Sequence, residues 1–239
     1  MRRQKRLRDA DPSGLGDWDS YAAIHEFPIE EYEKAKSEIL VEGYCDTAIV
    51  TLSRTAAEGS ALSMDLDGDG STVNGTTYLE LDDNERNLMK FCKENFKHTI
   101  VLLNTSSAME IGFLDSEEYN VEACLWIGHP GDAGLVGVGK LITGAVNPSG
   151  RLVDTWAYDV STNPTFYNMD NNRYANGQDA DNDTFYQYEE GIYVGYRFFE
   201  TADAEGYFDS PAFTGHAFKN GTAAGYEQVV QFPFGAEDH

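Results

Sequence analysis

Apolar stretches that predict buried strands alternate along this sequence with stretches whose apolar residues recur at helical spacing. The predicted strands cover residues 46–52, 98–104 and 122–127. The predicted helices cover residues 28–42, a stretch that starts at Asp82 with the inner stripe Leu88, Phe91, Cys92 and Phe96, and residues 132–143, closed by Gly144. This alternation predicts an α/β fold, a three-layer sandwich with a mostly parallel central sheet and helices on both faces.

The start of the second helix has the clearest local signal. Asp82-Asp83-Asn84-Glu85 places an acidic cap before the helix and a glutamate three residues later, which is the pattern of a capping box. After Tyr158 such patterns fade. Residues 163–190 are rich in Asn, Asp, Tyr and Gly, and we expect an irregular segment there. Strand-like patterns return at residues 191–199 and 228–232.

These patterns predict a single α/β-sandwich domain over residues 1–239. Its expected parts are an N-terminal extension at 1–27, a core at 28–160, an irregular excursion at 161–190, and final strands with a domain border at 191–239. With 41% hydrophobic residues, a chain of this length can bury a substantial core.

Charge and hydropathy exclude several classes of partner. Seventeen basic and forty-one acidic side chains give a net charge of −24, which would repel a phosphate backbone, so we expect no nucleic-acid partner. No run of about 18 apolar residues could cross a bilayer, so we expect no membrane association. The basic residues 2–8 are not followed by an apolar segment, so no export signal is visible. Cys45, Cys92 and Cys124 are predicted to be buried free thiols, which favours a cytoplasmic location over secretion.

Neither a metal nor a cofactor is expected. Asp65, Asp67 and Asp69 imitate the start of a calcium loop, but Thr76 stands where a bidentate glutamate is needed, so an acidic surface loop is the better interpretation. A second acidic run has a weaker spacing still and is predicted to be a solvated loop; it comprises Asp179, Asp181 and Asp183. The five histidines have no metal-ligand spacing.

Glu58 is the leading candidate for catalysis. It follows the strand predicted at 46–52, and a parallel strand delivers the residues after its carboxyl end to the crevice where α/β sheets bind ligands. A glutamate beside a glycine at a strand end is also a common solvated loop residue. From position alone both interpretations of Glu58 remain open.

A set of motifs in a fixed order adds a family resemblance. In this order, the chain contains Glu58-Gly59, Tyr78-Leu79-Glu80-Leu81, Val101-Leu102-Leu103-Asn104, Trp126-Ile127-Gly128-His129-Pro130-Gly131, Val146-Asn147-Pro148-Ser149-Gly150-Arg151-Leu152 and Glu190-Gly191-Ile192-Tyr193-Val194-Gly195-Tyr196-Arg197. The last two strings are the most specific. Together the motifs resemble the α/β-sandwich domain of glycoside hydrolase family 3, from about Cys45 to Gly235.

The resemblance implies a function. Members of that family are typically retaining β-glycosidases. Their (β/α)8 barrel supplies an aspartate nucleophile and their sandwich domain supplies the acid/base. The residue of this chain that matches the acid/base is Glu58. The implied substrate is a β-linked oligosaccharide or glycoside, with β-glucosidase-like or β-xylosidase-like specificity, and the implied partner is the barrel domain. Since no barrel fits in this length, the chain by itself is expected to be inactive.

Departures from the family pattern leave one alternative. The family usually continues from Phe-Pro-Phe-Gly into a fibronectin type III domain, whereas only four residues follow Gly235 here. An excised part, a split gene product and a permuted domain order all fit this pattern. The alternative function is a noncatalytic module of the same family that binds a carbohydrate or a partner domain.

Other residues in these motifs have structural interpretations. Asn147-Pro148-Ser149-Gly150-Arg151 is predicted to shape the turn between a helix and the next strand. Trp126 and Trp156 could stack on a sugar ring, but aromatic residues beside apolar strands are usually core residues. His129 follows a predicted strand and could line the cleft.

Overall fold

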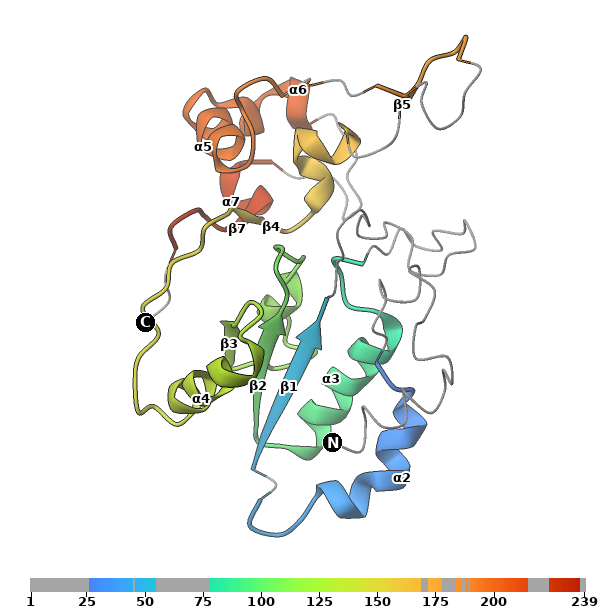
Figure 1. Cartoon of the computed structure of the whole chain (residues 1–239), viewed down its shortest axis with the longest axis vertical. Coiled ribbons are helices and arrows are strands. Elements are labelled where there is room, and N and C mark those ends of the chain that lie inside the picture. Colours follow the sequence, from blue (N-terminus) through green and yellow to red (C-terminus); the bar gives the residue numbers. More distant parts are fainter. Residues whose placement is uncertain are drawn as a thin grey trace. The chain divides into compact units, whose positions relative to one another are not determined.

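Three parallel strands form the centre of the first of two units in this chain. The structure, a computed structural model, describes residues 26–44, 46–54, 78–168, 172–177, 184–185, 188, 190–214 and 224–236. Unit 1 comprises Met1–Ser107 and Phe113–Val146, and unit 2 comprises Ala108–Gly112 and Asn147–His239. The strands of unit 1 are β1 (Thr47–Ser53), β2 (His98–Asn104) and β3 (Ala123–Trp126), paired in that order (Figure 1).

The register of this sheet brings the three strand ends to one edge. Thr47 pairs with His98 and Ser53 with Asn104 across β1 and β2, and Leu103 pairs with Trp126 across β2 and β3. β1 buries every second side chain, as expected for a strand with one buried face, whereas β2 buries side chains on both faces. The predicted parallel α/β core is therefore confirmed. Its arrangement as a three-layer sandwich stays a prediction.

Three helices belong to unit 1 (Figure 1): α2 (Ile29–Ile39), α3 (Asp83–Asn95) and α4 (Gly131–Ile142). All three were predicted within a few residues of these bounds. The inner face of α3 buries Leu88, Phe91 and Cys92 as predicted, with Met89 added and Phe96 only half-buried. α3 contacts both β1 and β2, and α2 contacts α3 through the rings of Tyr32 and Phe91, whose centroids lie 6.1 Å apart.

Unit 2 has a different kind of core. Its longest described helix is α5 (Tyr196–Ala204), and one of its two-stranded antiparallel sheets joins β4 (Trp156–Ala157) to β7 (Val230–Phe232). The short elements α6 (Pro211–Thr214), α7 (Tyr226–Val229) and η5 (Tyr207–Asp209) surround the same core. The buried cluster consists of Ala157, Phe199, Ala202, Phe208, Phe213, Val229 and Val230.

The strand predicted at residues 191–199 is wrong. Gly191 and Gly195 have φ values of 57° and 60°, which interrupt extended backbone, and α5 begins at the next residue, Tyr196. In a helix Phe199 and Ala202 fall on one face, and both are buried in the cluster of unit 2. Burial of that face overrides the β-propensity of the segment. The strand predicted at 228–232 is confirmed over β7 (Figure 1).

The excursion predicted at 161–190 contains only short elements among its described residues. These are η3 (Val160–Thr162), η4 (Pro164–Asn168) and the antiparallel pair of β5 (Asn172–Arg173) and β6 (Thr184–Phe185). A further short helix, η2 (Gly112–Asp115), lies between β2 and β3 in the sequence. Nowhere in the described ranges is a helix both long enough and apolar enough to cross a bilayer.

Candidate functional site

The carboxyl ends of β1, β2 and β3 form the edge of the sheet where the sequence predicts the site. The Asn104 side chain amide lies 3.4 Å from the Ser53 hydroxyl, so the ends of β1 and β2 are linked by side chains as well as by backbone. The Arg54 N–H donates to the Asn104 carbonyl at 3.2 Å, which extends the pairing one residue beyond β1. At β3, the Trp126 indole donates to the Thr105 carbonyl at 2.7 Å.

Glu58 itself lies outside the described residues. The structure describes Arg54 and the residues from Tyr78 onward, which flank the segment 55–77 on its two sides. Asp65, Asp67, Asp69 and the acidic run at 179–183 lie outside it too. Among the residues that are described, no three His, Cys, Asp or Glu side chains form a group that could hold a metal ion.

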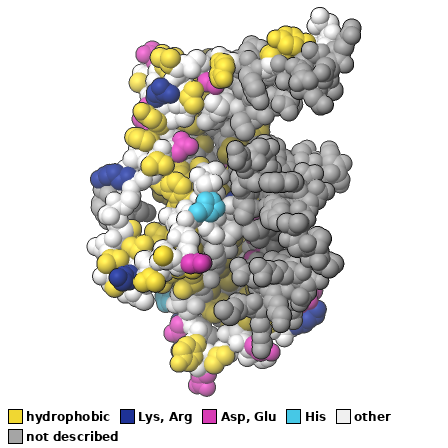
Figure 2. Space-filling model, in the orientation of Figure 1, with side chains coloured by type: hydrophobic (Ala, Val, Ile, Leu, Met, Phe, Trp, Pro, Cys, Tyr) yellow, Lys and Arg dark blue, Asp and Glu magenta, His cyan; other side chains and the backbone are white. Residues whose placement is uncertain are grey.

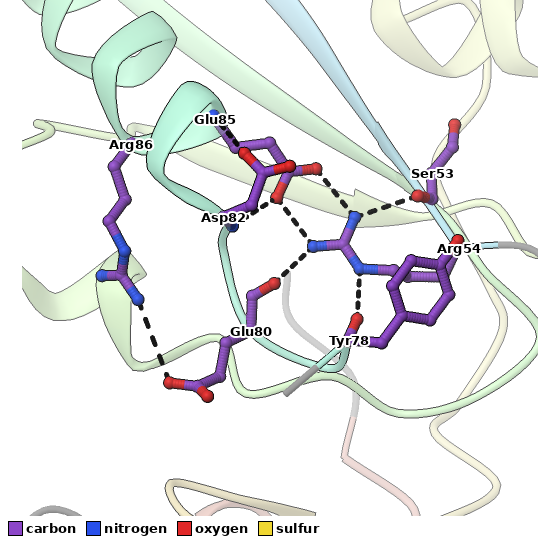
Figure 3. A network of polar contacts seen from close by, with 7 residues as sticks. All are labelled: Ser53, Arg54, Tyr78, Glu80, Asp82, Glu85 and Arg86. Carbon is purple, nitrogen blue, oxygen red and sulfur yellow. Dashed lines mark hydrogen bonds and ion pairs between the residues drawn. The ribbon is translucent and has the colours of Figure 1, made fainter. Parts of the chain in front are cut away.

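Arg54 joins the two ends of that segment (Figure 3). Its side chain is 3% exposed. Nε donates to the carbonyl of Tyr78 and Nη2 to the carbonyl of Glu80, each at 2.5 Å, while Nη1 donates to the carbonyl of Ser53 at 2.9 Å. The Tyr78 ring also lies against the guanidinium, with 5.2 Å between the ring centroid and Cζ. One side chain thus contacts backbone on both sides of residues 55–77.

The remaining two donors of Arg54 reach Glu85. Nη1 donates to Oε1 and Nη2 to Oε2, both at 2.7 Å, so the pair is bidentate and all five guanidinium N–H groups are used. Both side chains are almost completely buried. Burial raises the pKa of the Glu85 carboxyl, and the hydrogen bonds and charge of Arg54 oppose that rise.

Glu85 is held in place by the start of α3. The Glu85 N–H donates to the Asp82 carboxylate at 2.7 Å, and the Asp82 N–H donates back to Glu85 Oε2 at 3.0 Å, which completes the predicted capping box. One carboxylate therefore caps the helix and binds the arginine. Nearby, Arg86 and Glu80 form a longer and more exposed ion pair at 3.9 Å (Figure 3).

The Arg54–Glu85 pair was not predicted from the sequence. The two residues are 31 positions apart, and Glu85 was interpreted only as a capping residue. A possible signal is a single arginine directly after a buried strand, because an ionised side chain at such a position must find a partner when the strand is buried. That signal does not identify the partner.

The other candidate residues fall into structural roles or stay open. Trp156 is 1% exposed in unit 2, which confirms it as a core residue. Trp126 is half-buried and bound to the Thr105 carbonyl. Arg151 donates to the Gly235 carbonyl at 3.0 Å, in agreement with a structural role for the motif around it. His129 is exposed after β3, and its role as a cleft residue remains a prediction.

The surface charge agrees with an acidic protein. On the face drawn in Figure 2, hydrophobic, acidic and basic side chains of the described residues are all exposed.

Comparison with known proteins extends these observations. The chain is 34% identical over 156 residues to a β-glucosidase of Ruminococcus albus, a match that covers 65% of this chain and 14% of the relative. It is 31% identical over 164 residues to a β-glucosidase of Schizophyllum commune, covering 69% of this chain and 78% of that sequence. The crystal structure of a β-glucosidase from Paenibacillus barengoltzii superposes with a TM-score of 0.59 at 25% identity, over 83% of this chain and 19% of that one.

These matches differ in how much of each relative they cover. The chain spans less than a quarter of the Ruminococcus relative and of the Paenibacillus structure. The family model for the glycosyl hydrolase family 3 C-terminal domain matches residues 20–196, which is most of the chain. The chain therefore belongs to glycosyl hydrolase family 3 and contains its C-terminal domain.

Proposed function

We propose that this chain supplies the general acid/base, Glu58, of a retaining β-glycosidase that is β-glucosidase-like and hydrolyses terminal β-linked sugars. The observation that carries the proposal is the family match over residues 20–196, which includes Glu58. The parallel sheet supports it, because β1 leads at its carboxyl end into the segment that contains Glu58.

The chemistry requires a second carboxylate. Retaining hydrolysis uses two carboxyl groups about 5 to 5.5 Å apart, one attacking the anomeric carbon and the other protonating the leaving oxygen. We assign the protonating role to Glu58 and the attacking role to an aspartate on a (β/α)8 barrel domain. That barrel is the proposed partner of this chain, and a β-linked oligosaccharide or glycoside is the proposed substrate.

It follows that residues 1–239 by themselves do not turn over glycosides. A barrel of about 250 residues cannot be part of this sequence. Turnover of an aryl β-glucoside by the purified 239-residue chain, abolished in Glu58→Gln, would contradict this part of the proposal.

The role of Glu58 is tested in the complete gene product that carries this sequence. Two substrates are compared by kcat/KM: cellobiose, whose leaving oxygen needs a proton, and 2,4-dinitrophenyl β-glucoside, whose leaving group departs without one. Because general acid catalysis contributes about 10²- to 10⁴-fold, Glu58→Gln should lower kcat/KM for cellobiose by that factor and leave the dinitrophenyl substrate nearly unchanged.

Glu117→Gln is the matched control, since Glu117 is an exposed glutamate of unit 1. It should leave both values unchanged. In Glu58→Ala the hydrolysis of the glycosyl-enzyme lacks its general base and limits kcat for the dinitrophenyl substrate. Azide should raise this kcat and give β-glucosyl azide, because azide needs no general base. An equal loss on both substrates in Glu58→Gln would show that Glu58 is not the proton donor.

A further inference from the structure

Unit 2 carries an exposed apolar surface outside both its buried core and the candidate site. Six large apolar side chains among its described residues are each 40 to 70% exposed. They are Val153, Ile192, Tyr193, Val194, Tyr196 and Phe234, and they are called the unit 2 patch below. Four of the six lie in residues 190–197, a specific sequence motif to which the proposed chemistry gives no role.

Contacts within unit 2 bring these residues together from three parts of the sequence. The rings of Tyr196 and Phe234 are stacked, with centroids 4.2 Å apart and 20° between their planes. The Gly235 N–H donates to the Leu152 carbonyl at 2.8 Å, which places Val153 beside the segment that carries Phe234. The patch is therefore one surface and not six scattered side chains.

The loop that supplies most of the patch is shaped by its backbone. Gly191 and Gly195 have φ values of 57° and 60°, and the Tyr193 N–H donates to the Glu190 carbonyl at 2.9 Å, which closes a turn between them. A Cβ built at Gly195 would lie 3.5 Å from Asp154 Oδ1, so this loop also lies beside the segment of Val153. A surface that is already ordered loses little conformational entropy when a partner covers it.

The size of the patch is that of an interface. Together the six side chains expose about 600 Å² of surface, which is at the upper end of the largest apolar patch on a typical monomer. Two such patches against each other would bury about 1,200 Å², the lower end of the range for a specific interface between proteins. The area is therefore sufficient for a weak dimer.

The side chains of the patch indicate what covers it. Val153, Ile192 and Val194 are aliphatic, so they neither stack on a sugar ring as an aromatic side chain does nor bind its hydroxyl groups, and apolar protein side chains suit them better. None of the six residues is charged, although the chain has a net charge of −24. In a two-fold dimer each copy presents the same surface to the other. An uncharged surface lets two copies of so acidic a chain meet without opposing carboxylates.

We propose that the unit 2 patch binds the same patch on a second copy of this chain. Burial of apolar surface drives the association, and repulsion between two copies of charge −24 opposes it. Salt screens this repulsion, so the dimer tightens as the ionic strength rises, whereas an interface held by ion pairs would weaken. The inference is independent of the role of Glu58.

The test is sedimentation velocity on both the complete gene product and the 239-residue chain. Over about 1 to 200 µM protein we expect a monomer–dimer equilibrium with a Kd on the order of 10 µM, as suits an interface of this size. The Kd should fall severalfold between about 0.02 and 0.5 M NaCl. Hydrogen exchange in the peptide that spans residues 191–198 should be slower at the highest protein concentration than at the lowest.

Ile192→Glu is the decisive variant. It places a carboxylate in the apolar contact on each copy, so the Kd should rise at least about tenfold. Because Ile192 is 70% exposed, the monomer should keep its thermal stability. Val136→Glu is the matched control: Val136 is 67% exposed on α4 of unit 1, and the substitution adds the same charge outside the patch. It should leave the Kd nearly unchanged.

Four results would overturn the inference. The first is a protein that stays monomeric at every concentration and salt. The second is a 239-residue chain that dimerises while the complete gene product does not, which would mean that another domain covers the patch. The third is an equal rise in Kd for Val136→Glu and Ile192→Glu, which would assign the effect to net charge or to α4. The fourth is a monomeric chain that binds cellohexaose and loses this binding in Tyr193→Ala, which would make a sugar the occupant.

Discussion

The two units bury their cores in different ways. Unit 1 buries aliphatic side chains from consecutive, regular elements, such as Val50 and Leu52 of β1 and Val101 and Leu103 of β2. The buried cluster of unit 2 combines the rings of Phe199, Phe208 and Phe213 with smaller aliphatic side chains, and each of its elements adds one or two residues. A regular element repeats its buried positions along the sequence, whereas a short element does not. The core of unit 1 can therefore be predicted from the sequence pattern, whereas the core of unit 2 cannot.

Phe208 is the centre of the core of unit 2. Its ring lies within 6.4 Å, centroid to centroid, of five other aromatic rings: Phe198, Phe199, Tyr207, Phe213 and Tyr226. It is 1% exposed. Aromatic rings in tilted or edge-to-face contact gain some energy beyond area burial, so such a cluster can replace the area that long strands would bury.

The largest expected effect comes from removing that ring. Phe208→Ala should destabilise unit 2 by about 4 kcal/mol, because truncating a buried phenylalanine costs about 3 to 5 kcal/mol. Each unit has its own described tryptophan, Trp126 in unit 1 and Trp156 in unit 2. In a Trp18→Phe background, a variant that keeps only Trp126 reports on unit 1 and a variant that keeps only Trp156 reports on unit 2. Urea denaturation followed by tryptophan fluorescence should show the shift in the variant that keeps Trp156.

Trp126 gives the internal control for that experiment. If the cores are separate, the transition seen at Trp126 should move much less than the transition seen at Trp156. An equal shift at both tryptophans would mean that the two cores unfold together, which contradicts their description as separate cores. No shift at Trp156 would show that Phe208 is not central to unit 2.

The next effect is on unit 1. Glu85→Leu leaves the Arg54 guanidinium buried without its carboxylate, which should cost about 3 kcal/mol, at the lower end of the 3 to 5 kcal/mol typical of broken buried pairs because leucine still fills the volume. The loss should appear at Trp126 in the same denaturation assay. The double variant Arg54→Met, Glu85→Leu should recover part of the loss, since it removes the unpaired charge.

A double-mutant cycle gives the sharper outcome. If Arg54→Met and Glu85→Leu each destabilise unit 1 and their effects simply add, the two side chains do not interact, and the bidentate contact has no energetic meaning. A coupling of more than about 1 kcal/mol is expected, because the residues are in direct contact.

How far the sequence predicts the fold follows from this difference between the units. The bounds of β2 and the cap of α3 were predicted because each depends on neighbours in sequence: a run of apolar residues, or Asp82 with Glu85 three positions later. The segment 191–199 was misassigned because its aromatic residues are also typical of strands. What decides the conformation there is the positive φ of Gly195 and the burial of Phe199 against residues distant in sequence.

The candidate site divides in the same way. Glu58 was assigned by resemblance to a family motif, and only its place after β1 follows from physical reasoning. Arg54 lies four residues before Glu58 in the sequence, yet its partners Tyr78, Glu80 and Glu85 lie 24 to 31 residues away from it. Contacts at such separations have no period, so a single sequence does not reveal them.

The smallest effect concerns thiol chemistry, which reports on unit 1 alone because all three cysteines lie there. Burial raises the pKa of Cys92 to about 11, with Glu26 adding to the rise, and raises the pKa of Cys124 to about 12. The thiolate is the reactive form. At pH 8, iodoacetamide should therefore label Cys92 and Cys124 only when unit 1 opens; Cys45→Ser removes the third thiol from the measurement.

The pH dependence has a definite sign. A free thiol has a pKa of about 8.5, so below that pH the folded and unfolded chains both hold these protons and the stability contribution is fully present. As pH rises through about 11 to 12 the unfolded chain has already lost the protons, and the contribution disappears. The rate of labelling, measured by mass spectrometry, should rise with pH above about pH 9 more steeply than the thiolate fraction of a free cysteine does. At pH 8 Glu85→Leu should speed the labelling and Phe208→Ala should not, because only Glu85→Leu weakens unit 1. Acceleration by both variants would show that opening of unit 1 depends on the aromatic core of unit 2.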